Sequence, residues 1–334
     1  MTSATIPLRR LCGGVGAIAA LVAGCVEPGL EADIDADIDA DIEARPYHCP
    51  VWQCGFNSAE VNGRSIRELN LDGLANADGV RMIGFIAPAG LFGNYRLDFA
   101  GDELIARNAG GKVLRGNQLV GATILVKKPG LLSLPLPITI IDYQEIDGWA
   151  AGAGKVPAYA MLYLDLESLL GVRNVCNGDL LDVLTTAATV LGGETYDLDA
   201  KTVEPGRDRW LTIACAGSAA AKMRLMNYGP HGDFDGDGHP ASVAQRQATL
   251  KMITADYCGH GDSYTGNHIP LQWENSGGTV VSPGPWGLPE AIWGPGGALC
   301  LDATRLDDAD VACPLPACDA FTLDDGEWAT FVPD

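Results

Sequence analysis

Between about Tyr47 and Ala214, short apolar runs alternate with clusters of Gly, Asn, Asp and Pro. The runs have the length of β-strands and are rich in β-branched and aromatic residues, as strands are. The eight best candidates are SIRELNL (65–71), VRMIGFIA (80–87), YRLDFAG (95–101), ELIARN (103–108), LVGATILVKK (119–128), PITIIDYQEI (137–146), PAYAMLYLDL (157–166) and DRWLTIACAG (208–217). The turn-forming AGD between two of them predicts a hairpin near Gly101.

Two helices are expected after these strands. The first covers about residues 218–227 and the second about residues 242–257, where apolar residues recur at helical spacing. Ser242 and Gln245 have the spacing of a capping box, in which each residue satisfies a free backbone group at the start of a helix. The second helix is therefore predicted to begin at Ser242.

The pattern changes again after the second helix. SYTGNHIPLQWEN (263–275) predicts a hairpin, and a Pro- and Gly-rich tail with short strands around Ala291 and Leu299 follows it. The fold class is therefore α+β, with a mainly antiparallel β body and two helices packed on it. With 334 residues, 47% of them hydrophobic, the chain is long enough for one large domain or two smaller ones.

The N-terminus has the layout of an export signal. Arg9 and Arg10 precede an apolar run that ends at Cys25 and is too short for a permanent transmembrane helix. The segment LVAGC at its end resembles the lipobox of bacterial lipoproteins, which implies that residues 1–24 are removed and that Cys25 is acylated. Val26 lacks the aspartate associated with inner-membrane retention, so an outer-membrane location is expected. The alternative is ordinary signal cleavage near this position.

An acidic segment follows the expected cleavage site. Residues 26–44 carry eight acidic side chains and no basic one, with acids at every second position from Asp33 to Glu43. Because these charges repel each other and little apolar area compensates, residues 25–45 are interpreted as a solvated tether between lipid and body. A low-affinity cation-binding tail is the alternative. The net charge of the chain, −21, argues against a nucleic-acid partner.

Cysteine usage fits an exported protein. Besides Cys12 in the signal and Cys25, eight cysteines lie in the body: Cys49, Cys54, Cys176, Cys215, Cys258, Cys300, Cys313 and Cys318. An even number of cysteines in an exported chain implies disulfides. The two C-x4-C spacings predict local Cys49–Cys54 and Cys313–Cys318 bridges. Zinc is disfavoured, since the usual C-x2-C and H-x3-H spacings of its ligands are absent.

Three segments carry a family resemblance: WLTIACAGSAAAKMRL (210–225), RQATLKMITADYCG (246–259) and LQW (271–273). They resemble the ADYC-domain family of bacterial lipoproteins, known chiefly from myxobacteria and named for the tetrapeptide found at Ala255–Cys258. The body is divided accordingly into a β-rich part, 46–200, and an ADYC-like region, 201–334, with the two helices, the hairpin and the Cys-rich tail. The resemblance implies an exported, cysteine-bearing domain, and it implies no activity.

Cys258 lies two residues before His260 and could form a thiol nucleophile with it. However, Cys258 follows a helix C-terminus, whose partial negative charge disfavours a thiolate, and catalytic Cys and His usually come from separate segments. A disulfide is favoured instead. If the two helices pack antiparallel, Cys215 before the first lies near Cys258 after the second, which predicts a Cys215–Cys258 bridge. A Cys176–Cys300 bridge is expected only because these are the two cysteines left after the other three pairs.

The segment DFDGDGHPAS (233–242) suggests a calcium site. Asp233, Asp235 and Asp237 occupy positions 1, 3 and 5 of a loop like that of an EF-hand, and a glycine occupies position 6. Position 12 is Ala244, so the bidentate glutamate of that motif is missing. Weak calcium binding by the three aspartates is therefore one hypothesis, and an acidic surface loop before a helix N-terminus is the other.

Four basic residues, Lys222, Arg224, Arg246 and Lys251, lie on the two expected helices of this acidic chain. They are expected to form a solvated face or to pair with acidic loops of the same protein. The alternative is that they receive an anionic partner.

Sequence motifs identify neither a reaction nor a ligand. The chain lacks H-E-x-x-H, G-x-x-x-x-G-K-[ST] and G-x-S-x-G motifs. The favoured hypothesis is a lipid-anchored cell-envelope protein that binds a partner or has a structural role, whose protein or glycan partner the sequence does not name. The alternative is an exported hydrolase that uses carboxylates or a Cys/His pair.

Overall fold

The computed structural model describes residue 52 and residues 58–90, 93–130, 134–165, 171–176, 186–266, 269–282, 287–306 and 309–332. Cys49–Asp334 form one compact unit. The expected signal peptide, Cys25, the acidic tether and the expected Cys49–Cys54 bridge lie outside the described residues.

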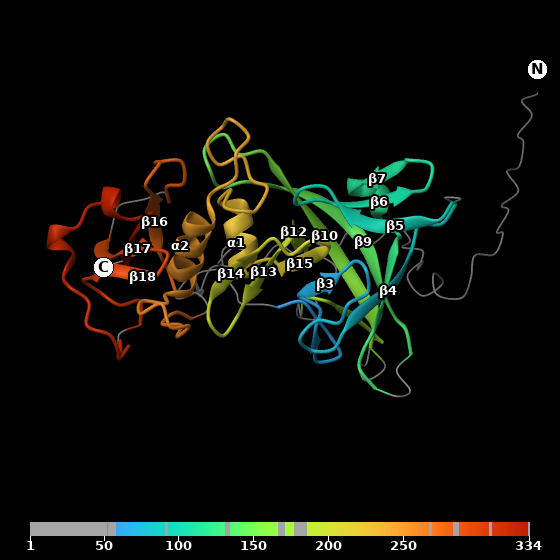
Figure 1. The fold of residues 1–334 in the computed structure, drawn as a ribbon, viewed down its shortest axis with the longest axis horizontal. Coiled ribbons are helices and arrows are strands. Elements are labelled where there is room, and N and C mark those ends of the chain that lie inside the picture. Colours follow the sequence, from blue (N-terminus) through green and yellow to red (C-terminus); the bar gives the residue numbers. More distant parts are fainter. Residues whose placement is uncertain are drawn as a thin grey trace, which may run out of the picture. The chain divides into compact units, whose positions relative to one another are not determined.

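Strands make up most of the regular structure, and two α-helices lie in the C-terminal half of the chain (Figure 1). In chain order the elements are β1 (Glu60–Val61), β2 (Arg64–Ser65), β3 (Glu68–Asn70), β4 (Arg81–Ile86), β5 (Tyr95–Phe99), β6 (Leu104–Asn108), β7 (Val113–Arg115), the 3-10 helix η2 (Gly116–Leu119), β8 (Thr123–Lys127), β9 (Leu136–Asp147), β10 (Lys155–Leu164), β11 (Val172–Asn174), β12 (Ala188–Gly192), β13 (Glu194–Asp197), β14 (Thr202–Pro205), β15 (Trp210–Cys215), α1 (Ala219–Leu225), α2 (Val243–Thr254), β16 (Gln272–Asn275), β17 (Leu288–Gly294), β18 (Gly297–Leu301), the 3-10 helices η3 (Cys318–Ala320) and η4 (Leu323–Asp325), and β19 (Trp328–Val332).

The largest sheet has eight strands in the order β3-β15-β12-β10-β9-β8-β4, with β11 paired to β10. All its strand pairs are antiparallel. In β8, Ile124 and Val126 are buried while Thr123, Leu125 and Lys127 are partly exposed, because successive side chains of a strand point to opposite faces. The buried face of this sheet forms one hydrophobic core, and the hairpin strands β5 and β6 contribute to it. Each of the eight predicted runs contains a strand, and the hairpin predicted near Gly101 is confirmed.

The central strand β12 was not predicted from the sequence. All five of its residues are buried. Val190 packs in the core of the large sheet, whereas Leu191 packs in a second core that the sheet shares with the helices. A strand covered on both faces lacks the alternation of polar and apolar residues that makes a half-exposed strand recognisable.

The two predicted helices are confirmed, each shorter than the predicted range. The hydroxyl of Ser218 accepts a hydrogen bond from the N–H group of Ala221 and caps α1. At α2, the Ser242 hydroxyl accepts from the Gln245 N–H at 3.2 Å, and the Gln245 side chain accepts from the Ser242 N–H at 2.9 Å. The predicted capping box is therefore present. Among the described residues, no helix is both long enough and apolar enough to cross a membrane.

A second sheet has the strand order β16-β19-β17-β18 and packs against α2. Trp293 of β17 and Trp328 of β19 are fully buried in the core between this sheet and the helices. The short strands expected near Ala291 and Leu299 are β17 and β18. The hairpin expected within 263–275 is wrong, because among the described residues of this range only Gln272–Asn275 forms a strand, β16, and it pairs with the distant β19.

Three disulfides link the described cysteines: Cys176–Cys215, Cys258–Cys313 and Cys300–Cys318. The prediction that the protein is α+β and cross-linked by disulfides is confirmed, but the predicted pairings Cys215–Cys258, Cys176–Cys300 and Cys313–Cys318 are wrong.

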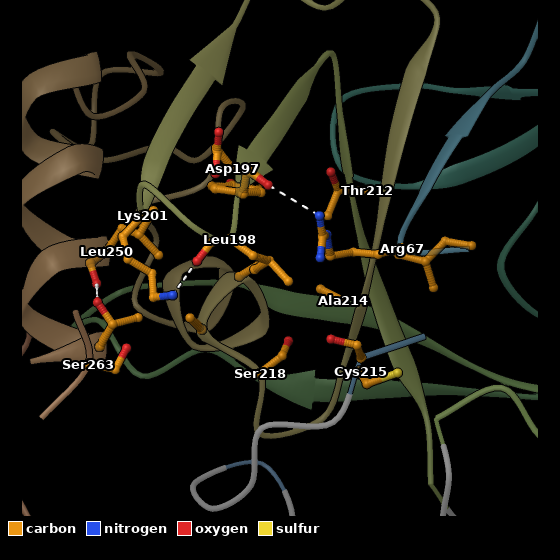
Figure 2. Close-up of a pocket in the computed structure, with 16 residues that line it drawn as sticks. Arg67, Asp197, Leu198, Lys201, Thr212, Ala214, Cys215, Ser218, Leu250 and Ser263 are labelled. Atoms are coloured by element: carbon orange, nitrogen blue, oxygen red, sulfur yellow. Dashed lines mark hydrogen bonds between the residues drawn. The ribbon is translucent and has the colours of Figure 1, made fainter. Parts of the chain in front are cut away.

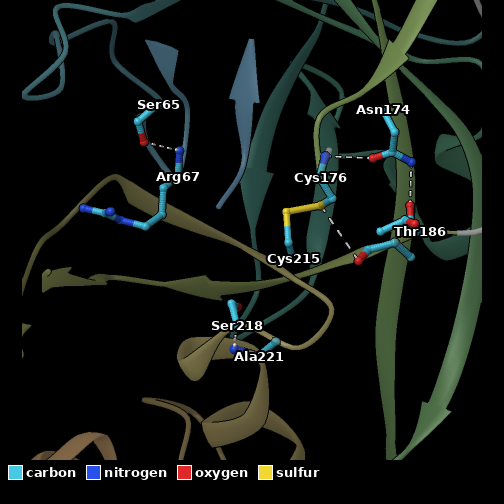
Figure 3. Close-up of a disulfide and its surroundings, with 9 residues drawn as sticks. Ser65, Arg67, Asn174, Cys176, Thr186, Cys215, Ser218 and Ala221 are labelled. Atoms are coloured by element: carbon cyan, nitrogen blue, oxygen red, sulfur yellow. Dashed lines mark hydrogen bonds between the residues drawn. A yellow bond between two sulfur atoms is a disulfide. The ribbon is translucent and has the colours of Figure 1, made fainter. Parts of the chain in front are cut away.

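Cys215 cannot reach Cys258 because of the face of β15 on which it lies. Ile213 and Cys215 point into the core of the large sheet, whereas Ala214 between them points into the core with the helices. Figure 3 shows Cys215 bonded to Cys176, whose N–H group donates to the side chain of Asn174. The pairing therefore follows from the face of β15 to which the cysteine side chain points, and not from the closeness of Cys215 to the helix in the sequence.

Cys313 and Cys318 are separated by the segment PLPA. Proline restricts its own backbone and that of the preceding residue, which favours an extended chain over a tight turn. The N–H of Leu301 donates to the carbonyl of Pro316 at 2.9 Å, so this segment lies along β18. Cys318 thus meets Cys300 of β18, and Cys313 meets Cys258.

Candidate functional site

The ADYC segment begins where α2 ends. Ala255 adopts the left-handed conformation with a φ of 49° and is fully buried. Its N–H bonds to the Met252 carbonyl, and its own carbonyl accepts from the N–H of Tyr264. A small residue is needed at this position because the chain reverses there inside the core, where a large side chain has no room.

Asp256 forms a buried ion pair with Lys251 of α2. The Lys251 Nζ lies 2.6 Å from Asp256 Oδ2, and only 3% and 0% of the two side chains is exposed. Lys251 also donates to the carbonyls of Ala200 and Gly259, and the N–H of Gly261 donates to the Asp256 carboxylate. The pair therefore joins the end of α2 to the turn that follows β13.

Tyr257 is held by a ring contact and by a hydrogen bond. Its ring stacks on that of Trp293 with centroids 5.2 Å apart, and its hydroxyl donates to Glu290 at 2.6 Å. Burial raises the pKa of Tyr257. Glu290 also pairs with Arg305 at 2.7 Å, and the Arg305 guanidinium donates to the carbonyl of Met252 near the C-terminus of α2.

Cys258 completes the segment through its disulfide to Cys313. The interpretation of Cys258 as a nucleophile is therefore wrong, and His260 is an exposed turn residue. Every described cysteine is in a disulfide. The backbone turn, the ion pair, the stacked ring and the disulfide all connect α2 to its surroundings, so this segment stabilises the fold.

Three of the four basic residues of the helices, Arg224, Arg246 and Lys251, pair with acidic residues of the same protein. Arg246 donates through Nε and Nη2 to Glu194, at 3.0 and 2.7 Å. Arg224 forms an ion pair with the fully buried side chain of Asp102 at 3.4 Å. Burial raises the pKa of Glu194, whereas the hydrogen bond and the charge of Arg246 act to lower it. Arg246 and Lys251 are almost completely buried, so they form no solvated face.

The three aspartates proposed to bind calcium lie in an exposed loop, and two of them bond to its backbone. The N–H of Gly238 donates to Asp233 at 2.7 Å, and the N–H of Asp237 donates to Asp235 at 2.9 Å. This second bond is the main cause that lowers the pKa of Asp235. In the described part of the chain, no group of three or more His, Cys, Asp or Glu residues could hold a metal ion. Calcium binding stays a prediction, and this arrangement does not support it.

A largely apolar pocket of about 230 Å³ lies between β13, β15 and the two helices (Figure 2). Its lining residues are Ser58, Arg67, Tyr196, Asp197, Leu198, Lys201, Thr212, Ile213, Ala214, Cys215, Ser218, Ala219, Ala220, Leu250, Thr254 and Ser263. Figure 2 shows Arg67 on one side and Lys201, Leu250 and Ser263 on the other. The sequence did not predict this pocket, because its lining comes from segments that only the fold brings together.

The polar groups of the pocket wall are mostly engaged with the protein itself. The hydroxyls of Thr212 and Thr254 donate to backbone carbonyls, each at 2.8 Å, and that of Ser218 caps α1. Lys201 donates to the carbonyl of Leu198. Among the described atoms of the lining, the buried Nε of Arg67 is a donor without a hydrogen-bond partner.

A wider and more open cleft of about 620 Å³ lies over Gly192 and Gly193. Its lining carries two internal ion pairs, Arg209 with Asp98 at 2.7 Å and Arg246 with Glu194 at 2.7 Å. A charged ligand would have to compete with these pairs. The apolar pocket is therefore the better candidate for ligand binding.

The fold and the pocket define an α+β domain that is cross-linked by disulfides and has space for a small ligand. The ADYC domain family matches residues 116–307, and the chain belongs to this family. The matched range contains both helices and most of the pocket lining, whereas Ser58 and Arg67 lie outside it. No curated protein and no solved structure matches the chain.

Proposed function

We propose that the protein is an exported, lipid-anchored envelope protein whose body binds a small, largely apolar ligand in the pocket between β13, β15 and the helices. The anchor is Cys25 at the end of the LVAGC segment, and the outer membrane is the membrane to which it attaches. The acidic segment 25–45 holds the body away from the membrane surface. The three disulfides support export, because such bonds persist in oxidising compartments.

The pocket is the observation that carries the binding function. Apolar side chains such as Leu198, Ala214 and Leu250 line most of it, and no histidine is among its described lining residues. Its cysteine is bonded to Cys176, and the hydroxyls of Thr212 and Ser218 serve the fold. A cavity of this kind offers apolar area for a ligand and lacks an activated nucleophile, so binding is favoured over hydrolysis.

Alanine-methyl NMR of the purified full-length protein tests the proposal. Ala214, Ala219 and Ala220 line the pocket and report on it directly. Octan-1-ol serves as a neutral apolar probe, and we expect it to shift these three methyl signals in a saturable way. Ala220→Leu fills part of the pocket and should weaken binding by at least about tenfold, since a packed site tolerates added volume poorly.

The exposed Ala77 provides the matched control. Ala77→Leu adds the same volume outside the pocket and should leave the octan-1-ol titration unchanged. Shifts spread over surface alanines, or binding that survives Ala220→Leu, would show that the pocket is not the ligand site.

A further inference from the structure

The large sheet has a face that is only partly covered. Its inner face forms the first core together with β5 and β6, and α1 packs on the other face at β12 and β15. Five adjacent strands, β4, β8, β9, β10 and β11, expose part of that second face to solvent. We refer to this part as the outer face.

Apolar side chains are exposed on the outer face. Ile86, Leu164 and Val172 are between 41% and 54% exposed. Phe85 and Tyr163 point into the core, so their neighbours Ile86 and Leu164 point outward. Val172 is paired with Leu164 and shares its face.

Two further apolar residues connect these exposed positions. Leu125 of β8 and Pro137 of β9 are paired with each other and are partly exposed. Pro137 precedes Ile138, which pairs with Tyr163, so Leu164 lies beside Pro137 on the next strand. The apolar residues therefore extend from β4 to β11. An apolar surface of this extent is typical of an interaction site.

Charged residues lie at the two ends of this apolar surface. Arg81 begins β4, Lys127 ends β8, and the two are directly opposite each other, where like charges repel. Neither forms an ion pair within the described part of the chain. The exposed Asp142 lies further along β9, and it points outward because its neighbour Tyr143 points into the core.

This distribution of charge makes the outer face complementary to itself. A two-fold axis between two such faces, perpendicular to the strands, places each end of one face against the other end of its partner. The apolar residues then meet, and Asp142 of each copy faces Arg81 and Lys127 of the other. An anionic bilayer would attract the two cations but repel Asp142, so a second copy is the better match.

The size of the outer face fits a weak dimer. Five strands spaced by about 4.8 Å, and about seven residues of β9 rising about 3.3 Å each, give roughly 550 Å² per copy. Two copies then bury about 1,100 Å², which is near the lower limit for a specific interface. The net charge of −21 opposes association, so a dissociation constant in the micromolar range is expected.

We propose that two copies of the protein associate through their outer faces, with the apolar residues in contact and Asp142 of each copy opposite Arg81 and Lys127 of the other. This inference is independent of the ligand pocket, because the outer face and the pocket share no residue named here.

Sedimentation equilibrium at about 1 to 200 µM protein measures the association. The chain from residue 25 onward is used without its acyl group, because it contains the whole compact unit Cys49–Asp334 and lipid would itself drive association. We expect a reversible equilibrium between monomer and dimer. Leu164→Lys should weaken dimerisation at least about tenfold, because it buries a charge in the interface. Leu288→Lys, at an exposed position of β17, is the matched control and should leave dimerisation unchanged.

An exchange of charges tests the orientation of the two copies. Asp142→Lys, and separately the double variant Arg81→Glu with Lys127→Glu, should each dimerise at least about tenfold more weakly than the wild type, since like charges then face each other. An equimolar mixture of the two variants should dimerise about as tightly as the wild type, because both ends of the mixed dimer are complementary again. This recovery would also show that both variants are folded.

A wild type that stays monomeric over this concentration range would overturn the inference. Charge variants that dimerise as tightly as the wild type, or a mixture that does not recover, would overturn it as well. A monomer that does not dimerise but binds vesicles of phosphatidylethanolamine and phosphatidylglycerol, and loses this binding with Leu164→Lys, would assign the outer face to a bilayer instead.

Discussion

Replacing Asp256 by asparagine tests whether the buried ion pair of the ADYC segment stabilises the fold. The substitution keeps the shape of the side chain and removes its charge, which leaves the ammonium group of Lys251 in the core without its counterion. The two side chains are 0% and 3% exposed, and their charged atoms lie 2.6 Å apart. Breaking a buried pair in this way costs about 3–5 kcal/mol. The carbonyls of Ala200 and Gly259 still accept from Lys251, so the lower end of this range is expected.

Urea-induced unfolding with the disulfides intact, followed by tryptophan fluorescence, measures the effect. Asp147→Asn is the matched control, since its pair with Lys155 is largely exposed, with side-chain exposures of 84% for Asp147 and 53% for Lys155. An exposed pair contributes about 0–1 kcal/mol, so the control should cost little.

The double variant Lys251→Met with Asp256→Asn separates charge from packing. Because it leaves no unpaired charge, it should be more stable than the sum of the two single changes indicates, by on the order of 1–3 kcal/mol. Strict additivity, or a loss for Asp256→Asn no larger than that for Asp147→Asn, would refute the electrostatic role assigned to Asp256.

Cys258–Cys313 closes the longest loop of the three described disulfides, 55 residues. Removing it by Cys258→Ala with Cys313→Ala should lower the free energy of unfolding, measured in urea, by about 4 kcal/mol on a chain-entropy estimate; peptide mapping that finds Cys258 free would contradict the pairing. Cys25→Ser should release the protein from the membrane fraction and change its mass by the loss of lipid, so an unchanged mass and fractionation would exclude the anchor. Burial lowers the pKa of Lys222 from 10.5 to about 8 in the folded protein. Between pH 8 and pH 10.5 the unfolded chain therefore binds more protons at this residue than the folded protein does, and the free energy of unfolding should rise with pH by up to about 3 kcal/mol. Subtracting the unfolding free energy of Lys222→Met at each pH isolates this contribution, and a difference that does not change with pH between 8 and 10.5 would contradict it.

Local sequence signals predicted the elements whose cause is local. The strand β8 was predicted because TILVK lies in a short apolar run rich in β-branched residues, which favours a strand without any distant contact. The start of α2 was predicted from Ser242 and Gln245, since a capping box needs only residues three positions apart. The strand β12 gave no such signal because it is covered on both faces.

The sequence by itself determined the α+β class, the two helices and the family, because apolar periodicity, capping residues and the ADYC segment are read within short windows of the chain. The disulfide partners were decided only by the tertiary structure, since the strand face on which Cys215 lies, and not its distance along the chain, directs it to Cys176. The pocket has the same origin, because Arg67 and Leu250 are 183 positions apart in the sequence and meet one cavity only after the sheet and helices have packed.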